Sequence, residues 1–245
     1  MSKFGVILPA AGGSSRFRHQ HYKKQFAPLG GRAVWLHTAE RFVNRDDVGQ
    51  VILAISPDDR EYFADKFGSN IAFMDMDLTT GGETRADTVE KALAKIKPEI
   101  EYVCVHDAAR PCVAEDWITK IFDAAEKHEA VIFGLPIAGT IKRVANQKIT
   151  ETVDREGLWE AQTPQVFRKQ LLLDAFAKRD GFAATDEAQL VERIGVQVHV
   201  LQGSPINLKI TTQEDLRLAE HALKAVPKPK AFGPAHPFKD DDMWR

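Results

Sequence analysis

The sequence predicts an α/β fold in which helices cover both faces of a mostly parallel, twisted sheet. Short apolar runs rich in β-branched residues alternate along the chain with segments of helical period, as in strands joined by crossover helices. At 245 residues, 44% hydrophobic and 28% charged, the chain is long enough for one large α/β domain or two small ones. One segment of alternating polarity adds a hairpin to this pattern.

The elements follow one another in this alternating order. The run at 4–8 ends at a Pro-Ala-Ala-Gly-Gly turn, which is typical of a buried strand followed by a tight turn. The other apolar runs are separated in most cases by apolar residues at helical spacing. We expect strands at 4–8, 51–55, 71–74, 102–105, 131–135 and 196–201, with helices at 34–42, 85–96 and 117–127 between them.

Residues 140–153 break this order and predict a hairpin. Residues 140–144 and 148–153 alternate apolar and polar side chains around a turn at Ala145-Asn146-Gln147. An isolated two-stranded ribbon is only marginally stable in water, so packing against a second subunit would stabilise it. We expect residues 137–156 to form an arm through which two copies of the chain associate as a homodimer.

The rest of the chain fits one domain, residues 1–226, followed by a tail at 227–245. Thr211 and Thr212 provide a hydroxyl cap ahead of an acidic first turn, which predicts a helix that includes residues 216–223. Beyond it, a segment rich in Pro and Lys leads to three consecutive Asp residues and has too few apolar side chains to fold by itself.

Charge and composition exclude several classes of protein. With 33 Lys and Arg against 35 Asp and Glu, the net charge of -2 leaves no basic excess for binding nucleic acid. No apolar run of about 18 residues predicts a membrane span, and the chain begins directly in a buried strand rather than a signal peptide. Cys104 and Cys112 lack metal-binding spacing and are expected to be buried thiols. A cytoplasmic protein is expected.

The loop after the first strand is a candidate phosphate site. Pro9-Ala10-Ala11-Gly12-Gly13-Ser14-Ser15-Arg16 is made of small residues that allow backbone N–H groups to approach phosphate oxygens, and Arg16, Lys23 and Lys24 add positive charge. The loop matches neither a dinucleotide-binding GxGxxG pattern nor a P-loop. Taken alone, it is equally consistent with an ordinary tight turn between strand and helix.

Two further loops place polar groups beside strands. Gly81 to Thr88 opens a helix with glycines, a hydroxyl and a cation, although Thr84 and Asp87 are equally consistent with a simple helix cap. Asp107 and Arg110 follow the strand at 102–105, where a ligand of a parallel sheet would lie. A single Asp can hold Mg²⁺ when substrate phosphates supply other oxygens, so Asp107 is the candidate metal ligand.

Together these motifs carry a resemblance to a known family. The chain contains the three loops above, the segment Lys24-Gln25-Phe26 and four later motifs, Thr152-Val153-Asp154-Arg155, Gln162-Thr163-Pro164-Gln165, Thr185-Asp186-Glu187-Ala188 and Asn207-Leu208-Lys209-Ile210-Thr211. In this order they resemble the 2-C-methyl-D-erythritol 4-phosphate cytidylyltransferases over roughly residues 4–223. The resemblance implies a Rossmann-like fold of the nucleotide-diphospho-sugar transferase type and transfer of a cytidylyl group from CTP to a short polyol phosphate.

The resemblance also implies a role for each candidate residue. Arg16, Lys24 and Lys209 would be catalytic, and Asp107 would bind Mg²⁺. CTP would contact Ala10, Ala11, Gly12, Gly13, Ser14, Gly81, Gly82 and Thr88. The acceptor would contact Thr140, Arg155, Thr163, Thr185 and Lys209, with Thr140 and Arg155 reaching in from the partner subunit's arm.

The first loop departs from the family pattern, and three alternatives remain open. Gly13-Ser14-Ser15 stands where a Gly-x-Gly-like stretch is commoner, and Phe17 stands where Met is frequent. A ribitol 5-phosphate cytidylyltransferase has closely similar motifs. A uridylyl- or thymidylyltransferase acting on a sugar 1-phosphate, and a catalytically inactive nucleotide-binding protein of the same fold, are more distant alternatives.

Overall fold

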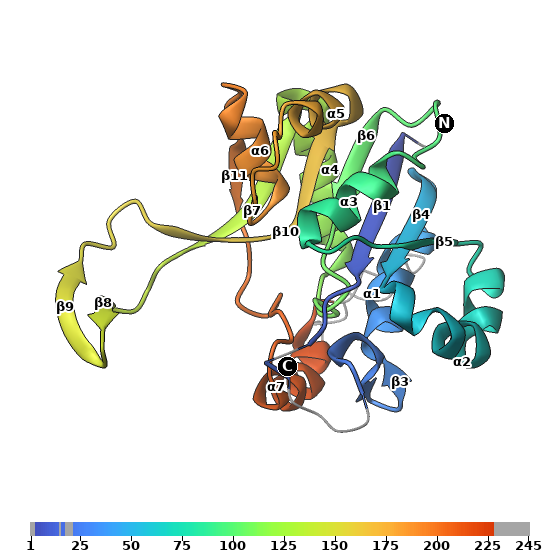
Figure 1. Ribbon diagram of the computed structural model, residues 1–245, viewed down its shortest axis with the longest axis horizontal. Coiled ribbons are helices and arrows are strands. Elements are labelled where there is room, and N and C mark those ends of the chain that lie inside the picture. The colour runs from blue at the N-terminus through green and yellow to red at the C-terminus, as the bar shows by residue number, and fades with distance from the viewer. Residues whose placement is uncertain (1–2, 15, 18–21, 228–245) are drawn as a thin grey trace, which may run out of the picture.

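The computed structural model describes residues 3–14, 16–17 and 22–227, and they form the expected α/β fold (Figure 1). A seven-stranded sheet has the order β11-β7-β10-β6-β1-β4-β5. Neighbouring strands run parallel except for β10, which is antiparallel to both β6 and β7. The strands are β1 (Phe4–Ala10), β4 (Val48–Ile55), β5 (Asp77–Thr80), β6 (Tyr102–Val105), β7 (Ala130–Pro136), β10 (Trp159–Arg168) and β11 (His199–Gln202).

Helices cover both faces of the sheet because successive strand residues point to opposite sides. On β1, Val6 and Leu8 belong to one core cluster, whereas Ile7 between them belongs to the other. The first cluster includes residues of α1 (Val34–Val43), α2 (Arg60–Phe73) and α4 (Glu115–His128). The second includes residues of α3 (Arg85–Leu93), α5 (Lys169–Ala177) and α6 (Glu187–Arg193).

A third, smaller core cluster joins the last described helix to a short ribbon near the start of the chain. The last helix, α7 (Gln213–Ala225), and the short ribbon of β2 (Pro28–Leu29) and β3 (Arg32–Ala33) share it, with Leu29 and Ala219 among its buried residues. The chain also forms two 3-10 turns, η1 (Lys24–Phe26) and η2 (Pro57–Asp59). Thr212 caps α7 and forms a capping box with Asp215, as the sequence predicts.

The strand order brings together the loops that follow β1 and β6, which carry Ala10 to Ser14 and Asp107. From β1 the chain continues outward to β4 and β5, and then returns to β6 on the other side of β1. Loops that leave neighbouring parallel strands on opposite sides of such a switch point diverge and leave a crevice at the strands' carboxyl ends. The crevice therefore lies between the loop after β1 and the loop after β6.

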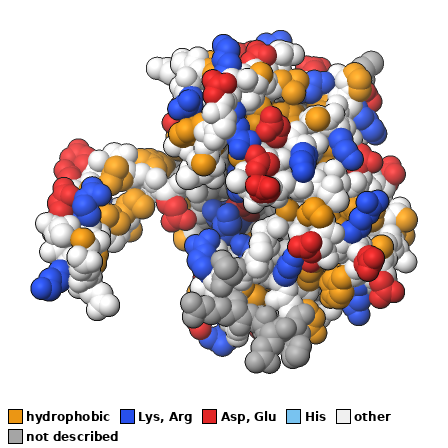
Figure 2. Space-filling view, in the orientation of Figure 1, with side chains coloured by type: hydrophobic (Ala, Val, Ile, Leu, Met, Phe, Trp, Pro, Cys, Tyr) orange, Lys and Arg blue, Asp and Glu red, His pale blue; other side chains and the backbone are white. Residues whose placement is uncertain are grey.

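The predicted hairpin is present and stands away from the body. Strands β8 (Ile141–Ala145) and β9 (Lys148–Val153) pair with each other in a separate two-stranded sheet. Figure 1 shows this arm joined to the body through extended segments that continue β7 and β10. In Figure 2 it projects beyond the body and carries hydrophobic side chains on its surface.

Several predicted boundaries need correction. Residues 71–73, expected to begin a strand, instead end α2, where Ile71 packs against the first core cluster. The neighbouring strand is the Thr-rich β5, which pairs with β4. Helix α3 ends at Leu93 rather than at 96, and β11 begins at His199 rather than at 196. Strand β10 was not predicted.

Two expectations concern the chain as a whole. No helix in the described part of the chain combines the length and the apolar character needed to cross a bilayer. From residue 228 onward, the expected tail lies outside the described residues.

Candidate active site

One pocket lies at the switch point of the sheet. It is bordered by the loop after β1, the turn that carries Lys24, the start of α3, the loop after β6 and Lys209. Ala10, Ala11, Gly12 and Lys24 line it on one side, and Asp107 and Lys209 line it on another. Residues from positions 9 to 209 thus meet in a single cavity at the carboxyl ends of β1 and β6.

The first loop is tied to the turn that carries Lys24. Ser14 has a φ of 56°, in the left-handed region, and its hydroxyl oxygen accepts a hydrogen bond from the Lys24 N–H at 3.1 Å. The buried side chain of Gln25 donates through Nε2 to the Ala10 carbonyl at 2.7 Å and accepts through Oε1 from the Ser14 hydroxyl at 3.3 Å. These bonds hold the loop and the lysine in one arrangement.

The second loop, which runs from Gly81 after β5 into the start of α3, is held by a helix cap and by close packing of its glycines. The Thr84 side chain accepts from the Asp87 N–H, and Asp87 accepts in return from the Thr84 N–H, which completes a capping box at the start of α3. A β-carbon added at Gly81 would lie 2.5 Å from the Ala11 β-carbon. Glycine is therefore required here because the first and second loops touch.

Asp107 lies at the centre of the cationic groups. Its Oδ1 accepts from Arg85 Nε at 3.1 Å, and its Oδ2 lies 2.7 Å from Lys209 Nζ and 3.7 Å from Arg110 Nε. Burial alone would raise the pKa of the Asp107 carboxyl, but Arg85, Lys209 and Arg110 outweigh burial and hold the pKa well below its usual range. The carboxylate is therefore charged at neutral pH.

Hydrogen bonds hold residues 207–210 close to the Asp107 carboxylate. The Ile210 N–H donates to the Ala109 carbonyl at 2.8 Å, which places Lys209 beside the loop after β6. Asn207 Nδ2 donates to the Thr163 carbonyl at 2.8 Å. Thr163 in turn accepts the Asp107 N–H through Oγ1 at 3.1 Å, so β10 helps to hold the aspartate.

The pocket is built for an anion. Lys24, Arg85 and Lys209 line it, against the carboxylates of Asp107 and Glu83. Behind this lining, Arg110 lies beside Asp107 and Glu187 beside Arg85, which leaves one more cation than carboxylates. Burial, with Lys209 as the next contributor, lowers the pKa of Lys24 to about 8. A lysine whose charge is destabilised in this way gains from binding a negatively charged ligand.

The residues present fit Mg²⁺ only in a limited way. Among the described residues, no three His, Cys, Asp or Glu side chains converge as a metal-binding group. Asp107 does offer one ionised carboxylate inside the pocket. Mg²⁺ commonly binds through one or two protein carboxylates and completes its shell with substrate phosphates and water, so this single group matches such a site.

The structure brings together some of the predicted residues and not others. Ala10, Ala11, Gly12, Gly82, Thr88, Lys24, Asp107 and Lys209 line the pocket, with Gly81 and Thr163 directly behind this lining. Gly13 and Arg16 are exposed, and Arg16 lies close enough to Lys24 to contribute to the lowering of its pKa. The Thr185 side chain contacts Gln189, while Thr140 and Arg155 are exposed in the arm, just outside β8 and β9.

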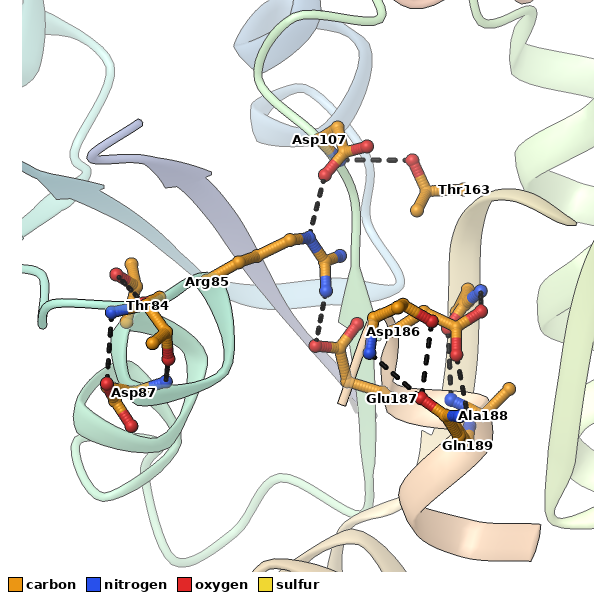
Figure 3. Close-up of polar contacts among 12 residues, drawn as sticks. Thr84, Arg85, Asp87, Asp107, Thr163, Asp186, Glu187, Ala188 and Gln189 are labelled. Atoms are coloured by element: carbon orange, nitrogen blue, oxygen red, sulfur yellow. Dashed lines mark hydrogen bonds and ion pairs between the residues drawn. The ribbon is translucent and has the colours of Figure 1, made fainter. Parts of the chain in front are cut away.

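Four residues missing from the predicted site participate in it through their side chains. Arg85 lines the pocket and contacts both Asp107 and Glu187 (Figure 3). Arg110 lies behind Asp107, with Nε 3.7 Å from its Oδ2. Gln25 lines the pocket beside Lys24. Each lies inside a motif quoted for the family resemblance, so the motifs located them, but nothing in their spacing indicated contacts between distant parts of the chain.

One known protein family matches most of this chain. The family model for 2-C-methyl-D-erythritol 4-phosphate cytidylyltransferase matches residues 4–225. The protein of that name from Rhodopirellula baltica is 39% identical over 89% of this chain and 93% of its own length. The bifunctional enzyme IspD/IspF of Desulfotalea psychrophila is 38% identical over 94% of this chain, which spans 59% of that longer protein.

Solved structures agree with the fold. A crystal structure of 4-diphosphocytidyl-2C-methyl-D-erythritol synthase superposes with a TM-score of 0.78 at 34% identity and covers 91% of this chain and 99% of that one. The 2-C-methyl-D-erythritol 4-phosphate cytidylyltransferase from Thermus thermophilus gives a TM-score of 0.73 at 30% identity, covering 89% and 98% of the two chains. The predicted fold class is confirmed.

Proposed function

This chain belongs to the 2-C-methyl-D-erythritol 4-phosphate cytidylyltransferase family, and from that premise we propose that it catalyses the family's reaction. CTP and 2-C-methyl-D-erythritol 4-phosphate would give 4-diphosphocytidyl-2-C-methyl-D-erythritol and pyrophosphate, a step of isoprenoid precursor synthesis by the non-mevalonate route. The relatives named above favour this acceptor over ribitol 5-phosphate.

The gathering of Lys24, Asp107 and Lys209 in one cationic pocket is the observation that carries the proposal. A nucleotidyl transfer brings two phosphate-bearing substrates together, and their mutual repulsion must be offset by positive charge. The pocket supplies that charge at the switch point of the sheet, beside the small-residue loop at Ala10 to Gly12.

In the reaction, an oxygen of the acceptor phosphate attacks the α-phosphorus of CTP. A new P–O bond forms, the bond between the α-phosphorus and its bridging oxygen breaks, and pyrophosphate leaves with the electron pair. No protein base is needed, because a phosphate monoester with a second pKa near 6 is largely dianionic at neutral pH. The protein's contribution is orientation and electrostatic stabilisation of the negative oxygens.

We assign these tasks to side chains by their position. Lys24 and Arg16, on the side of the first loop, stabilise the triphosphate, with backbone contacts from Ala10, Ala11, Gly12, Gly13 and Ser14. Gly81, Gly82 and Thr88 face the cytosine and ribose from the second loop. Lys209 in the pocket lining is assigned a role toward both substrates, and the family resemblance assigns Thr163 and Thr185 to the acceptor.

Asp107 is the residue that would hold Mg²⁺. When bound there, the cation would neutralise charge on phosphate oxygens. Arg85, followed by Lys209 and Arg110, holds the pKa of the Asp107 carboxyl well below its usual range, so the carboxylate is ionised.

The arm supports a shared site in a homodimer. Thr140 and Arg155 belong to the acceptor set by family resemblance, yet in a single chain they lie in the arm, just outside its two strands, and do not line the pocket. Val144 and Ile149, paired across the hairpin, are 57% and 64% exposed and offer an apolar contact. We therefore assign the arm, residues 137–156, to the partner's active site.

The free, buried thiols of Cys104 and Cys112 suit a cytoplasmic protein.

The test is pyrophosphate release by purified protein with Mg²⁺ and CTP. Parallel reactions contain 2-C-methyl-D-erythritol 4-phosphate or ribitol 5-phosphate as acceptor, with ATP, GTP and UTP as donor controls. Preference for CTP and the methylerythritol acceptor is the expected result. Preference for ribitol phosphate would replace the acceptor and retain the mechanism, whereas no release with either acceptor would reject the function.

A further inference from the structure

A buried ion-pair chain connects the pocket to a helix that does not line it. Arg85, the first residue of α3, donates through Nε to Asp107 Oδ1 at 3.1 Å and through Nη1 to Glu187 Oε1 at 2.7 Å. Figure 3 shows the guanidinium lying between the two carboxylates. Glu187 is the first residue of α6 and is only 1% exposed.

Glu187 is itself held in place from the sheet. Gln165 on β10 accepts the Ala188 N–H through Oε1 at 3.2 Å and donates through Nε2 to Asp186 Oδ2 at 2.9 Å. Asp186 caps α6 by accepting the Gln189 N–H at 3.0 Å. The first turn of α6 is therefore fixed to β10, and Glu187 offers Arg85 a stationary anchor.

The contact with Glu187 limits how the Arg85 guanidinium can bind Asp107. A guanidinium prefers to grip one carboxylate with two parallel N–H groups. The N–H groups that lie parallel on one side of the guanidinium are those of Nε and Nη2. Glu187 holds Nη1 at 2.7 Å and so fixes the rotation of the guanidinium, in which Nε contacts Oδ1 of Asp107, Nη2 has no hydrogen-bond partner and Oδ2 is left for Lys209 at 2.7 Å. If the anchor were lost, the guanidinium could rotate until Nε and Nη2 took both oxygens of Asp107.

Stability alone does not account for this arrangement. Within the described residues, Arg85 Nη2 and Glu187 Oε2 are buried and have no hydrogen-bond partner. Buried ion pairs with unmet hydrogen-bonding atoms contribute little net stability, because desolvation offsets their attraction. The geometry is instead suited to orienting the pocket carboxylate.

We propose that Glu187 is a positioning residue that acts through Arg85 to keep Oδ2 of Asp107 turned toward Lys209 and the pocket. The proposal rests on the proposed function, since it assigns Asp107 to the nucleotide and its metal. Groups that orient the ligands of a metal or of a reacting phosphate typically change affinity or activity by about 10- to 100-fold when removed.

The test uses Glu187→Gln, which keeps the shape of the side chain and removes its charge. The expected result is a fall in kcat/KM of about 10- to 100-fold. CTP affinity in the presence of Mg²⁺, measured by calorimetry without acceptor, should weaken in parallel while the melting temperature and circular dichroism stay close to those of the wild type. Glu192→Gln, an exposed site on the same helix, is the matched control and should change none of these quantities.

A double-mutant cycle separates positioning from general support of the fold. In an Asp107→Asn background, Glu187→Gln should cause no further loss of CTP affinity, because the group that it positions is already altered. An equal loss in both backgrounds, or E187Q within twofold of wild type, would overturn the proposal.

Arg85→Lys provides the second variant if E187Q does not fold. Lysine keeps the positive charge but cannot bridge both carboxylates with fixed geometry, so R85K should reproduce the loss of CTP affinity, and unchanged affinity would overturn the proposal. Because calorimetry needs no turnover, it also separates failure of this proposal from failure of the proposed function, which would appear as an inactive wild type.

Discussion

The backbone N–H of Lys24 donates to the Ser14 side chain at 3.1 Å, which joins the loop after β1 to the turn that carries the lysine. Ser14 adopts a φ of 56°, a conformation that glycine tolerates best, and its hydroxyl also donates to Gln25. Ser14 thus adds specific contacts between this loop and residues 24 and 25.

Ser14→Ala should lower kcat/KM about two- to tenfold, because a hydrogen bond of this kind contributes about 1 kcal/mol. Ser14→Gly should show a similar loss, since it relieves the backbone but also lacks the hydroxyl. The measurement is steady-state pyrophosphate release, with exposed Ser69→Ala on α2 as the control. Unchanged activity in both Ser14 variants would show that the contact does not position Lys24.

Lys24→Ala should lower kcat by about 10²- to 10³-fold, the usual effect of removing one electrostatic donor from a reacting oxyanion. Saturating both substrates separates this effect from weakened binding. Lys66→Ala, an exposed site on α2, serves as the control. Near-normal turnover at saturation would remove Lys24 from the catalytic set.

The pH dependence of kcat/KM should report the same lysine. Burial, followed by the charge of Lys209, lowers the pKa of Lys24 to about 8, so the active ammonium form predominates below that pH. We expect kcat/KM to be level between about pH 7 and pH 8 and to fall above it, because this parameter reports the free enzyme and the free substrates. Below about pH 6, protonation of the acceptor phosphate also lowers it. In Lys24→Arg the guanidinium stays charged, and any remaining activity should lose this fall. A fall that persists in the arginine variant would belong to another group.

Gly81→Ala should weaken CTP binding and destabilise the protein by about 1–3 kcal/mol through overpacking. The new β-carbon would lie 2.5 Å from the Ala11 β-carbon and 2.7 Å from Thr88 Oγ1, so the two nucleotide loops would be forced apart. Thermal unfolding and calorimetric CTP titration measure the two effects. Gly68→Ala, where a β-carbon meets nothing within 4 Å inside α2, should instead be neutral or stabilising. A Gly81→Ala protein with wild-type CTP affinity would contradict the close-packed second loop.

Replacing both Val144 and Ile149 with Asp should convert the protein to a monomer and reduce activity. These side chains form the exposed apolar pair of the arm, and charge there would oppose its contact with a partner. Sedimentation velocity gives the oligomeric state, with exposed Lys148→Ala in the same hairpin as the control. A monomer that keeps full activity would refute the shared site.

The sequence predicted local features well and long-range ones poorly. The strand at 4–8 and the hairpin are visible as local patterns of polarity, and the structure contains both. Ile71 was misassigned because the apolar end of an amphipathic helix and a short buried strand look alike in a few residues. Strand β10 was missed because polar motif residues such as Gln162 and Gln165 interrupt its apolar pattern.

The same limit applies to the site. The motif positions of Lys24 and Asp107 identified two pocket residues directly. The pairing of Arg85 with Glu187 joins residues 102 positions apart, and no periodicity in a single sequence encodes such a contact. It depends on how α3 and α6 lie on the same face of the sheet.

The order in which the pocket residues occur has a consequence for biosynthesis. The lining begins in the first strand and ends at Lys209, which is held to the loop after β6 by the Ile210 backbone and followed directly by α7. A nascent chain that has emerged only as far as α6 contains most of the sheet but lacks a cation of the site. On the proposed function, a fragment that ends before Lys209 would therefore lack a cation of the pocket and would not consume CTP.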